Sequence, residues 1–136
     1  MSETTVGPEH FVERIRSEVV RAGGATDSAF RLLEEGLQNH PLSVALWCLR
    51  GDVIQLAGED GPHTFDEAEA SYLRAAELAP TDPEPIESLG HFYDDVMDDP
   101  LRAEPYFRQA LALGAGASAQ EGLAQVLEEL AEGEIE

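Results

Sequence analysis

The sequence predicts an all-α protein of about seven helices, and three observations support that class. Apolar residues recur at intervals of three and four along nearly the whole chain. No segment shows the sustained alternation of period two that is typical of strands. Helix-start and helix-stop signals divide the pattern into short segments. The 136 residues can bury one core, so we expect a single domain over residues 10–132, with a flexible N-terminus (1–9) and an acidic tail (133–136).

The first three helices are predicted from their apolar spacing and their ends. The Gly23-Gly24 pair ends the first, Pro41 follows the second, and Ser43 can cap the third. Their apolar positions are, in order, Phe11, Val12, Ile15, Val19 and Val20; Phe30, Leu32, Leu33 and Leu37; and Val44, Leu46, Trp47, Val53, Ile54 and Leu56.

Two capping boxes and two Asp-Pro pairs mark the starts of the other four helices. In a capping box, a hydroxyl and a carboxylate satisfy free backbone N–H groups, and proline at the first helical position loses no hydrogen bond. The boxes are Thr64 with Glu67 and, after the breaker "GAGA", Ser118 with Glu121; the pairs are Asp82-Pro83 and Asp99-Pro100. The fourth helix is expected to end near Leu78 and the last near Glu132.

One set of intervals occurs three times. Small residues stand where two helices would touch, and a large residue stands where it would fill the gap between them. The copies are Ala29, Leu33, Gly36 and Pro41; Ala68, Tyr72, Ala75 and Pro80; and Ala103, Phe107 and Ala110. Preceding halves match as Trp47, Gly51 and Ile54, and as Ile86, Leu89, Gly90 and Tyr93, while the first copy has Arg16 at a position that is usually small. These intervals predict a two-helix repeat of about 34 residues.

This pattern resembles the tetratricopeptide (TPR) family from about Phe11 to Leu113. The resemblance implies a right-handed superhelical stack of antiparallel helix pairs, with repeats at about 10–42, 43–81 and 82–117 and a capping helix at 118–132. Trp47 is interpreted as interhelical core, with a role in stacking against a ligand as the alternative. The chain departs from the family at Arg50, where an aliphatic residue is usual, and at "AGEDGPH", an insertion within 57–63. The insertion is either a contact loop or tolerated extra length.

In such stacks the first helices of the pairs line a concave surface that holds a peptide or a partner helix. The resemblance assigns to this groove, as partner-binding residues, Cys48, Asp52, Gln55, Glu84, Glu87, His91, Asp94 and Asp95. Ala45 joins them, and the first repeat adds Glu13 and Ser17. A carboxylate clamp, as used for chaperone C-termini, is disfavoured because acidic and small residues replace the Lys, Arg and Asn of such clamps.

Charge points to the kind of partner. The formal net charge is −20, with 28 acidic residues, and all eight basic residues are Arg. Nucleic acid is disfavoured as a ligand, because its binding requires clustered basic residues. We expect a protein partner with a basic segment or face, unless the charge serves only solubility.

Two function classes remain open. The first is a non-enzymatic adaptor that binds a partner in an acidic groove. The second is an acidic inhibitor, immunity protein or nucleic-acid mimic that occludes a basic site. An adaptor should concentrate specific residues in the groove, whereas a mimic should spread carboxylates over other surfaces such as the last helix.

No catalytic residue, metal site or cofactor is predicted. The acidic run Asp94–Asp99 lacks the glycine turn and ligand register of a calcium loop and is interpreted as the solvated end of the fifth helix. His91 with Asp94 or Asp95 offers too few ligands for zinc. Cys48 with His91 lacks a third orienting group for thiol catalysis. Neither "GGAT" nor "GAGA" follows a strand, so neither cradles a phosphate.

The expected compartment is the cytoplasm. The single cysteine cannot form an internal disulfide, and the N-terminal residues lack the features of a secretory signal. No apolar run reaches the length of a membrane span. We expect a monomer, with a dimer as the alternative.

Overall fold

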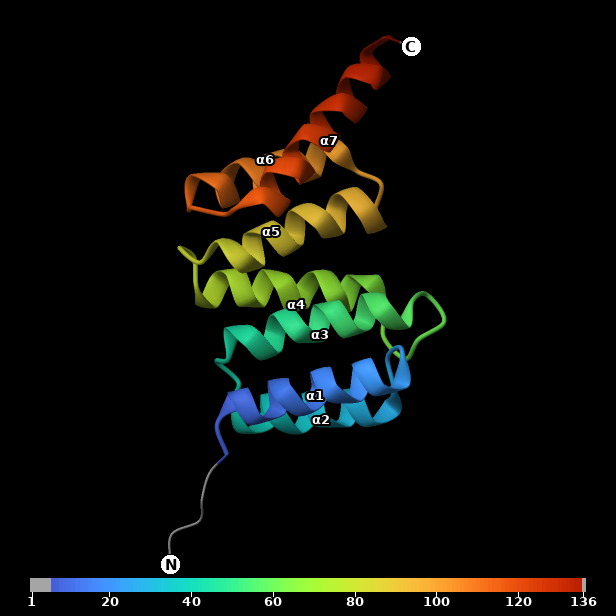
Figure 1. Ribbon diagram of the computed structural model, residues 1–136, viewed down its shortest axis with the longest axis vertical. Coiled ribbons are helices and arrows are strands. Elements are labelled where there is room, and N and C mark those ends of the chain that lie inside the picture. Colours follow the sequence, from blue (N-terminus) through green and yellow to red (C-terminus); the bar gives the residue numbers. More distant parts are fainter. Residues whose placement is uncertain (1–5, 136) are drawn as a thin grey trace, which may run out of the picture. The chain divides into compact units, whose positions relative to one another are not determined.

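The computed structural model describes residues 6–135, with side chains described up to Gly133. These residues form helices and loops and contain no strand, so the predicted all-α class is confirmed. The elements are α1 (Pro8–Ala22), α2 (Asp27–Asn39), α3 (Val44–Ala57), α4 (Phe65–Leu78), α5 (Pro83–His91), the π-helical turn η1 (Phe92–Val96), α6 (Pro100–Ala112) and α7 (Ala117–Ile135) (Figure 1).

The chain forms two compact units, Met1–Ala75 and Ala76–Glu136, whose boundary falls inside α4. In the first unit α1 packs against α2, and α3 contacts both. In the second unit α6 packs between α5 and α7. The division of the sequence into three repeats and one domain stays a prediction.

Local sequence signals place most helix ends where they were predicted. The Ser43 hydroxyl accepts a hydrogen bond from the Leu46 N–H at 3.2 Å. The Thr64 and Glu67 pair forms a reciprocal capping box, with bonds of 3.3 Å and 2.8 Å. Asp82 and Asp99 accept bonds from the first turns of α5 and α6, at 3.0 Å and 3.2 Å.

The start of α7 differs from the prediction. Ser118 lies inside the first turn and does not cap the helix, because α7 already begins at Ala117. The Gly116 carbonyl accepts the first helical bond from Gln120, and the Ser118 hydroxyl lies 3.1 Å from His91 Nε2. The hydroxyl therefore has a tertiary partner. The helix also continues past Glu132 to Ile135.

Helices α1 and α7 extend beyond the predicted limits of the domain. At the N-terminus, α1 begins at Pro8, inside the segment that was predicted to be flexible. Residues 1–5 of that segment, and Glu136 of the predicted acidic tail, lie outside the described residues.

Glycines let the large side chains of neighbouring helices approach the backbone, as the repeat pattern predicted. A Cβ on Gly51 would lie 2.5 Å from the Tyr72 ring. On Gly90 and Gly122 it would lie 2.9 Å and 2.5 Å from the ring of Phe107. Tyr72 and Phe107 are fully buried, and so are the small residues of their repeat copies, Ala68, Ala75, Ala103 and Ala110.

Not every apolar position of the helical pattern is buried. The main core of the first unit consists of Phe11, Val12, Ile15, Ala29, Leu33, Leu46, Leu49 and Val53. Val20, however, is 80% exposed and Leu56 is 54% exposed. Trp47 is only half-buried, and its indole N–H reaches the Pro41 carbonyl at 2.8 Å, so its prediction as core is wrong.

Candidate functional site

An apolar hollow opens between α1 and α3 in the first unit. Its volume is about 220 Å³. Its lining residues follow helical spacing on each helix and are Arg16, Val19 and Val20 from α1, and Leu49, Asp52, Val53 and Leu56 from α3. We refer to these seven residues as the α1–α3 hollow. Val20 and Leu56, the two exposed apolar positions noted above, both belong to this set.

Asp52 supplies a fixed carboxylate in this apolar setting. The buried Tyr72 hydroxyl donates to Asp52 Oδ1 at 2.6 Å. Gln55 Nε2 donates in turn to the Tyr72 oxygen at 2.7 Å. Because Gly51 lets the Tyr72 ring lie against the backbone of α3, the hydroxyl is held at one position. The chain Gln55–Tyr72–Asp52 therefore orients the carboxylate.

The same surroundings shift the pKa values of Asp52 and Tyr72. Asp52 is open to solvent on one side, but nearby protein atoms remove part of its hydration, and this burial raises the pKa of its carboxyl group. The Tyr72 hydrogen bond and the Arg16 charge oppose that rise. Burial, together with the Asp52 charge, raises the pKa of Tyr72 far above its ordinary value. The tyrosine is thus a donor throughout the physiological range.

The other groove residues predicted in the first unit have different environments. Cys48 is 4% exposed, so its thiol lies within the protein. Gln55 is half-buried and engaged with Tyr72. Glu13 and Ser17 are exposed on α1 and line a neighbouring depression, so it is Arg16, with its two valines, that meets α3. This rotation of α1 could not be predicted, because the first repeat copy, with Arg16 at a usually small position, matches the pattern least well.

In the second unit, Glu87, His91 and Asp95 form a line at intervals of four residues. His91 Nε2 lies 3.4 Å from a Glu87 oxygen, and His91 Nδ1 lies 3.9 Å from an Asp95 oxygen. The imidazole also meets the Phe107 ring edge-on, with 4.9 Å between ring centroids. This histidine is therefore held between two carboxylates and the hydroxyl of Ser118 from α7. Glu84 is exposed in the first turn of α5.

Asp94 departs from its predicted place in a solvated turn. It is 8% exposed, and its Oδ1 atom has no hydrogen-bond partner among the described residues. Burial, followed by the nearby Glu129, raises the pKa of Asp94 to about 7. Asp94 is buried because η1 is a π-helical turn, in which the Met97 N–H donates a hydrogen bond to the Phe92 carbonyl. One extra residue in the turn shifts the register and rotates Asp94 inward.

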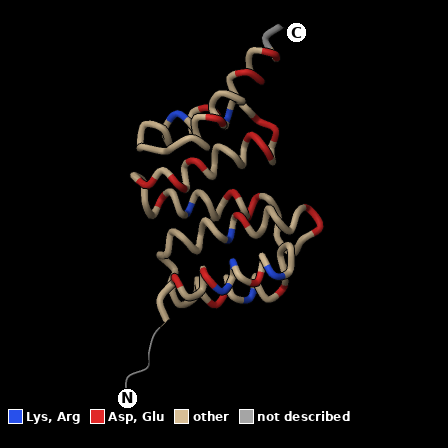
Figure 2. The backbone as a smooth tube through the Cα atoms, viewed as in Figure 1, with Lys and Arg blue, Asp and Glu red and all other residues tan. Residues whose placement is uncertain are grey.

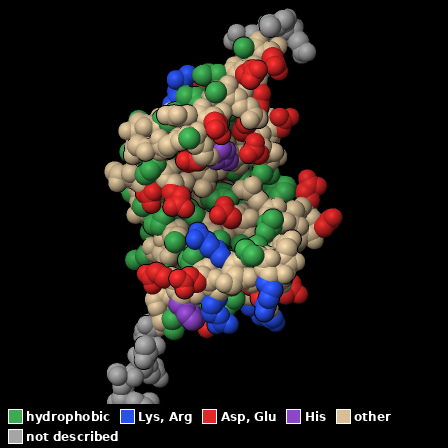
Figure 3. All heavy atoms as spheres, in the orientation of Figure 1, with side chains coloured by type: hydrophobic (Ala, Val, Ile, Leu, Met, Phe, Trp, Pro, Cys, Tyr) green, Lys and Arg blue, Asp and Glu red, His purple; other side chains and the backbone are tan. Residues whose placement is uncertain are grey.

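Charge is distributed unevenly along the chain (Figure 2). Residues 1–75 contain six arginines and thirteen acidic residues, whereas residues 76–136 contain two and fifteen. On the face shown in Figure 3, hydrophobic side chains reach the surface beside the carboxylates. Among the described residues, no three His, Cys, Asp or Glu side chains are grouped to hold a metal ion. Within the same residues, no helix is both long enough and apolar enough to cross a bilayer.

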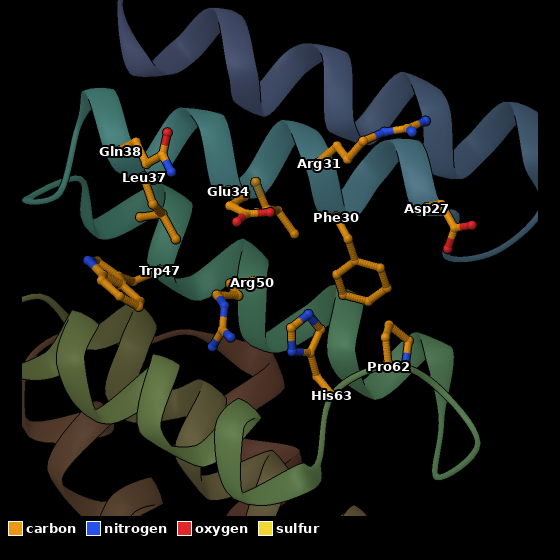
Figure 4. A pocket seen from close by; sticks show the side chains of 11 residues that line it. Asp27, Phe30, Arg31, Glu34, Leu37, Gln38, Trp47, Arg50, Pro62 and His63 are labelled. Atoms are coloured by element: carbon orange, nitrogen blue, oxygen red, sulfur yellow. The ribbon is translucent and has the colours of Figure 1, made fainter.

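A second pocket, of about 560 Å³, was not predicted from the sequence. It lies between α2, a different face of α3, and the loop before α4 (Figure 4). Arg50 and His63 both line it. Two sequence features could have indicated this pocket, because Arg50 and the 57–63 insertion both depart from the repeat pattern and both contribute to its lining.

Comparisons with known proteins support the fold. No protein-family model and no curated protein sequence matches the chain. A similar solved structure is that of PilW, described as a widely conserved type IV pilus biogenesis factor, with a TM-score of 0.76 and 19% sequence identity. The match covers 92% of this chain and 55% of that one, so the chain spans about half the length of this neighbour. At this identity the likeness supports a TPR-like helical repeat and no particular activity.

Proposed function

We propose that this chain is a non-enzymatic protein-interaction module that holds a segment of a partner protein on the α1–α3 hollow. The observation that carries the proposal is an apolar surface left open by two packed helices beside one oriented carboxylate. Val20 and Leu56 remain exposed, and both line this hollow. A concave apolar lining beside a placed polar group is typical of binding sites.

The hollow indicates what the partner segment presents. Its volume of about 220 Å³ suits one aliphatic side chain rather than a large ligand. The fixed Asp52 carboxylate favours a Lys or Arg next to that side chain, through a charge-assisted hydrogen bond. Arg16 at the rim disfavours an unbroken basic run. The partner segment therefore combines an aliphatic residue with a neighbouring basic one, and the overall charge of −20 speeds its encounter.

The test uses Val20→Asp in the intact chain. Val20 is 80% exposed, so the substitution should leave the fold intact while it places a charge in the hollow. The matched control is Leu42→Asp, because Leu42 is 67% exposed and does not line the hollow. A partner captured with the wild-type chain is purified, and its affinity for the three proteins is measured by calorimetry at several salt concentrations.

We expect Val20→Asp to weaken binding at least tenfold and Leu42→Asp to change it less than twofold. Affinity should also fall as salt rises, because the screening length shortens from about 10 Å at 0.1 M to about 3 Å at 1 M. Unchanged affinity in Val20→Asp would exclude the hollow as the docking site.

The acidic-mimic alternative rests on a different observation. Helix α7 carries Glu121, Glu128 and Glu132 on its exposed surface, and it contains no arginine. If the chain acts by occluding a basic site, changing these three residues to Gln should weaken binding more than Val20→Asp does. The same calorimetric series therefore separates the two functions.

A further inference from the structure

The second pocket of the first unit brings together the two features that depart from the repeat pattern. Arg50 lies on its floor, and the inserted loop contributes Pro62 and His63 to its wall (Figure 4). Its volume of about 560 Å³ is within the range of ligand-binding pockets. Trp47 and Arg50 approach it from the face of α3 that is turned away from the α1–α3 hollow. The pocket is therefore separate from the site proposed above.

The centre of the pocket is polar, and two of its polar groups have no partner within the described residues. Arg50 Nη1 donates to the Glu67 carbonyl at 3.3 Å and to Ser71 Oγ at 2.7 Å, while Nη2 lies 3.6 Å from the Glu67 carboxylate. Within the described residues, Arg50 Nε–H has no hydrogen-bond partner. Glu34 stands on α2 at the middle of the same pocket (Figure 4), and its carboxylate makes no ion pair within the described chain. One donor and one acceptor thus remain available.

The two ends of the pocket are apolar and rigid. Leu37 and Trp47 form one end, and Phe30 with His63 forms the other (Figure 4). The bond from the Trp47 indole to the Pro41 carbonyl fixes that ring at 2.8 Å. His63 is held by Glu67 at 3.3 Å, and its ring lies on Phe30 with 4.9 Å between centroids. The inserted loop is therefore packed against α2.

We propose that this pocket binds an extended peptide segment that carries two apolar side chains three residues apart. A backbone amide offers one N–H and one C=O, which match the free carboxylate of Glu34 and the free N–H of Arg50. The two apolar side chains occupy the two ends. Phe30 and Leu37 are seven residues apart on one helix, or about 10 Å along its axis. Residues i and i+3 of a polyproline II segment are separated by about 9 Å and point the same way.

The charges around the pocket favour this ligand over an anionic one. Arg50 already faces the Glu67 carboxylate at 3.6 Å, and Glu34 adds a second negative charge, so the centre has no uncompensated positive charge for an anion. Asp27 and Arg31 also line the pocket, but their side chains point away from its centre (Figure 4). A neutral peptide with apolar side chains fits this balance, in contrast to the basic segment proposed for the α1–α3 hollow.

The test uses the intact chain and the blocked tetrapeptide Ac-Leu-Ala-Ala-Phe-NH₂. Trp47 is the single tryptophan, so its fluorescence and its indole resonance report occupancy directly. The variant is Glu34→Ala, and the matched control is Glu35→Ala, the next residue, which is also exposed but does not line the pocket. Ac-Ala-Ala-Ala-Ala-NH₂ is the control peptide. The variant Val20→Asp tests independence from the α1–α3 hollow.

We expect a saturable shift of the Trp47 signals with the Leu/Phe peptide, weakened at least fivefold by Glu34→Ala and unchanged by Glu35→Ala or Val20→Asp. The tetra-alanine peptide should give no saturable shift. Three results would overturn the proposal: no saturation with the Leu/Phe peptide, equal loss in Glu34→Ala and Glu35→Ala, or binding only when the peptide termini are left charged. None of these results bears on the α1–α3 hollow, so the two proposals can fail separately.

Discussion

The contact between Gly51 and Tyr72 allows a stability effect to be worked out from the structure. In Gly51→Ala the new Cβ would lie 2.5, 2.7 and 2.8 Å from three atoms of the Tyr72 ring. Carbon atoms cannot approach so closely, and the ring is fully buried, so it must shift or α3 must move. Overpacking of this kind costs about 1–3 kcal/mol.

Two further effects act in opposite directions. A shift of the ring would break the 2.6 Å bond to Asp52, and a hydrogen bond to a charged group is worth about 1.5–3 kcal/mol. Alanine, in turn, favours a helix interior over glycine by about 1 kcal/mol. The steric and hydrogen-bond losses exceed the propensity gain, so we expect Gly51→Ala to lower the free energy of unfolding by about 2–4 kcal/mol.

Urea denaturation followed by circular dichroism measures this change. Gly133→Ala serves as the control, because nothing lies within 4 Å of a Cβ at that helical position. That variant should be neutral or slightly more stable. In the double variant Gly51→Ala/Tyr72→Leu, the two changes should cost less than their sum, since the smaller side chain relieves the clash. A Gly51→Ala protein as stable as the Gly133→Ala protein would refute this account of the α3–α4 contact.

Three other predictions follow from the same packing. The raised pKa of Asp94 means that the native state holds its proton more tightly than the unfolded chain, so this carboxyl group favours folding at low pH and loses that contribution as pH rises from about 4 to about 7. Asp94→Asn should flatten this part of the stability profile in urea melts and raise stability at pH 8. A chain that ends at Ala117 should aggregate in size-exclusion chromatography, because loss of α7 uncovers Phe107; a monomer with an unchanged melting temperature would contradict this. Trp47→Ala should cost less than the roughly 3–5 kcal/mol of a buried aromatic, since Trp47 is half-buried; a larger loss would restore its assignment to the core.

Local chemistry explains why most of the fold could be predicted. A capping box such as Thr64 with Glu67 depends on three or four consecutive residues, so the sequence alone locates it. The spacing of Gly51 and Tyr72 reflects a contact that Gly90 and Phe107 repeat in the next helix pair, so recurrence reveals it. The π-helical turn at Phe92–Val96 has no such signal, because neither a capping motif nor a recurring contact marks it in the sequence.

The candidate site was less predictable because it depends on how helices are rotated against each other. The sequence predicted Asp52 as a partner-binding residue of a groove; Asp52 lines the α1–α3 hollow, and its role in binding stays a prediction. The sequence could not show that Arg16, rather than Glu13 or Ser17, completes the surface from α1. It also could not show that Asp94 turns inward. Each of these differences follows from a shift of one residue or less in helical register, which rotates a side chain by about 100°.

The Tyr72 hydroxyl explains how a carboxylate can persist in the apolar α1–α3 hollow. A lone Asp52 among valines and leucines would lose hydration without compensation, and its protonated form would be favoured. The 2.6 Å bond from Tyr72 offsets part of that cost and also fixes the direction of the carboxylate. Tyr72 can act in this way only because Gly51 admits its ring to the backbone of α3. The glycine that lets the repeat pack is thus the same residue that prepares the proposed binding surface, which couples the stability of the first unit to its recognition of a partner.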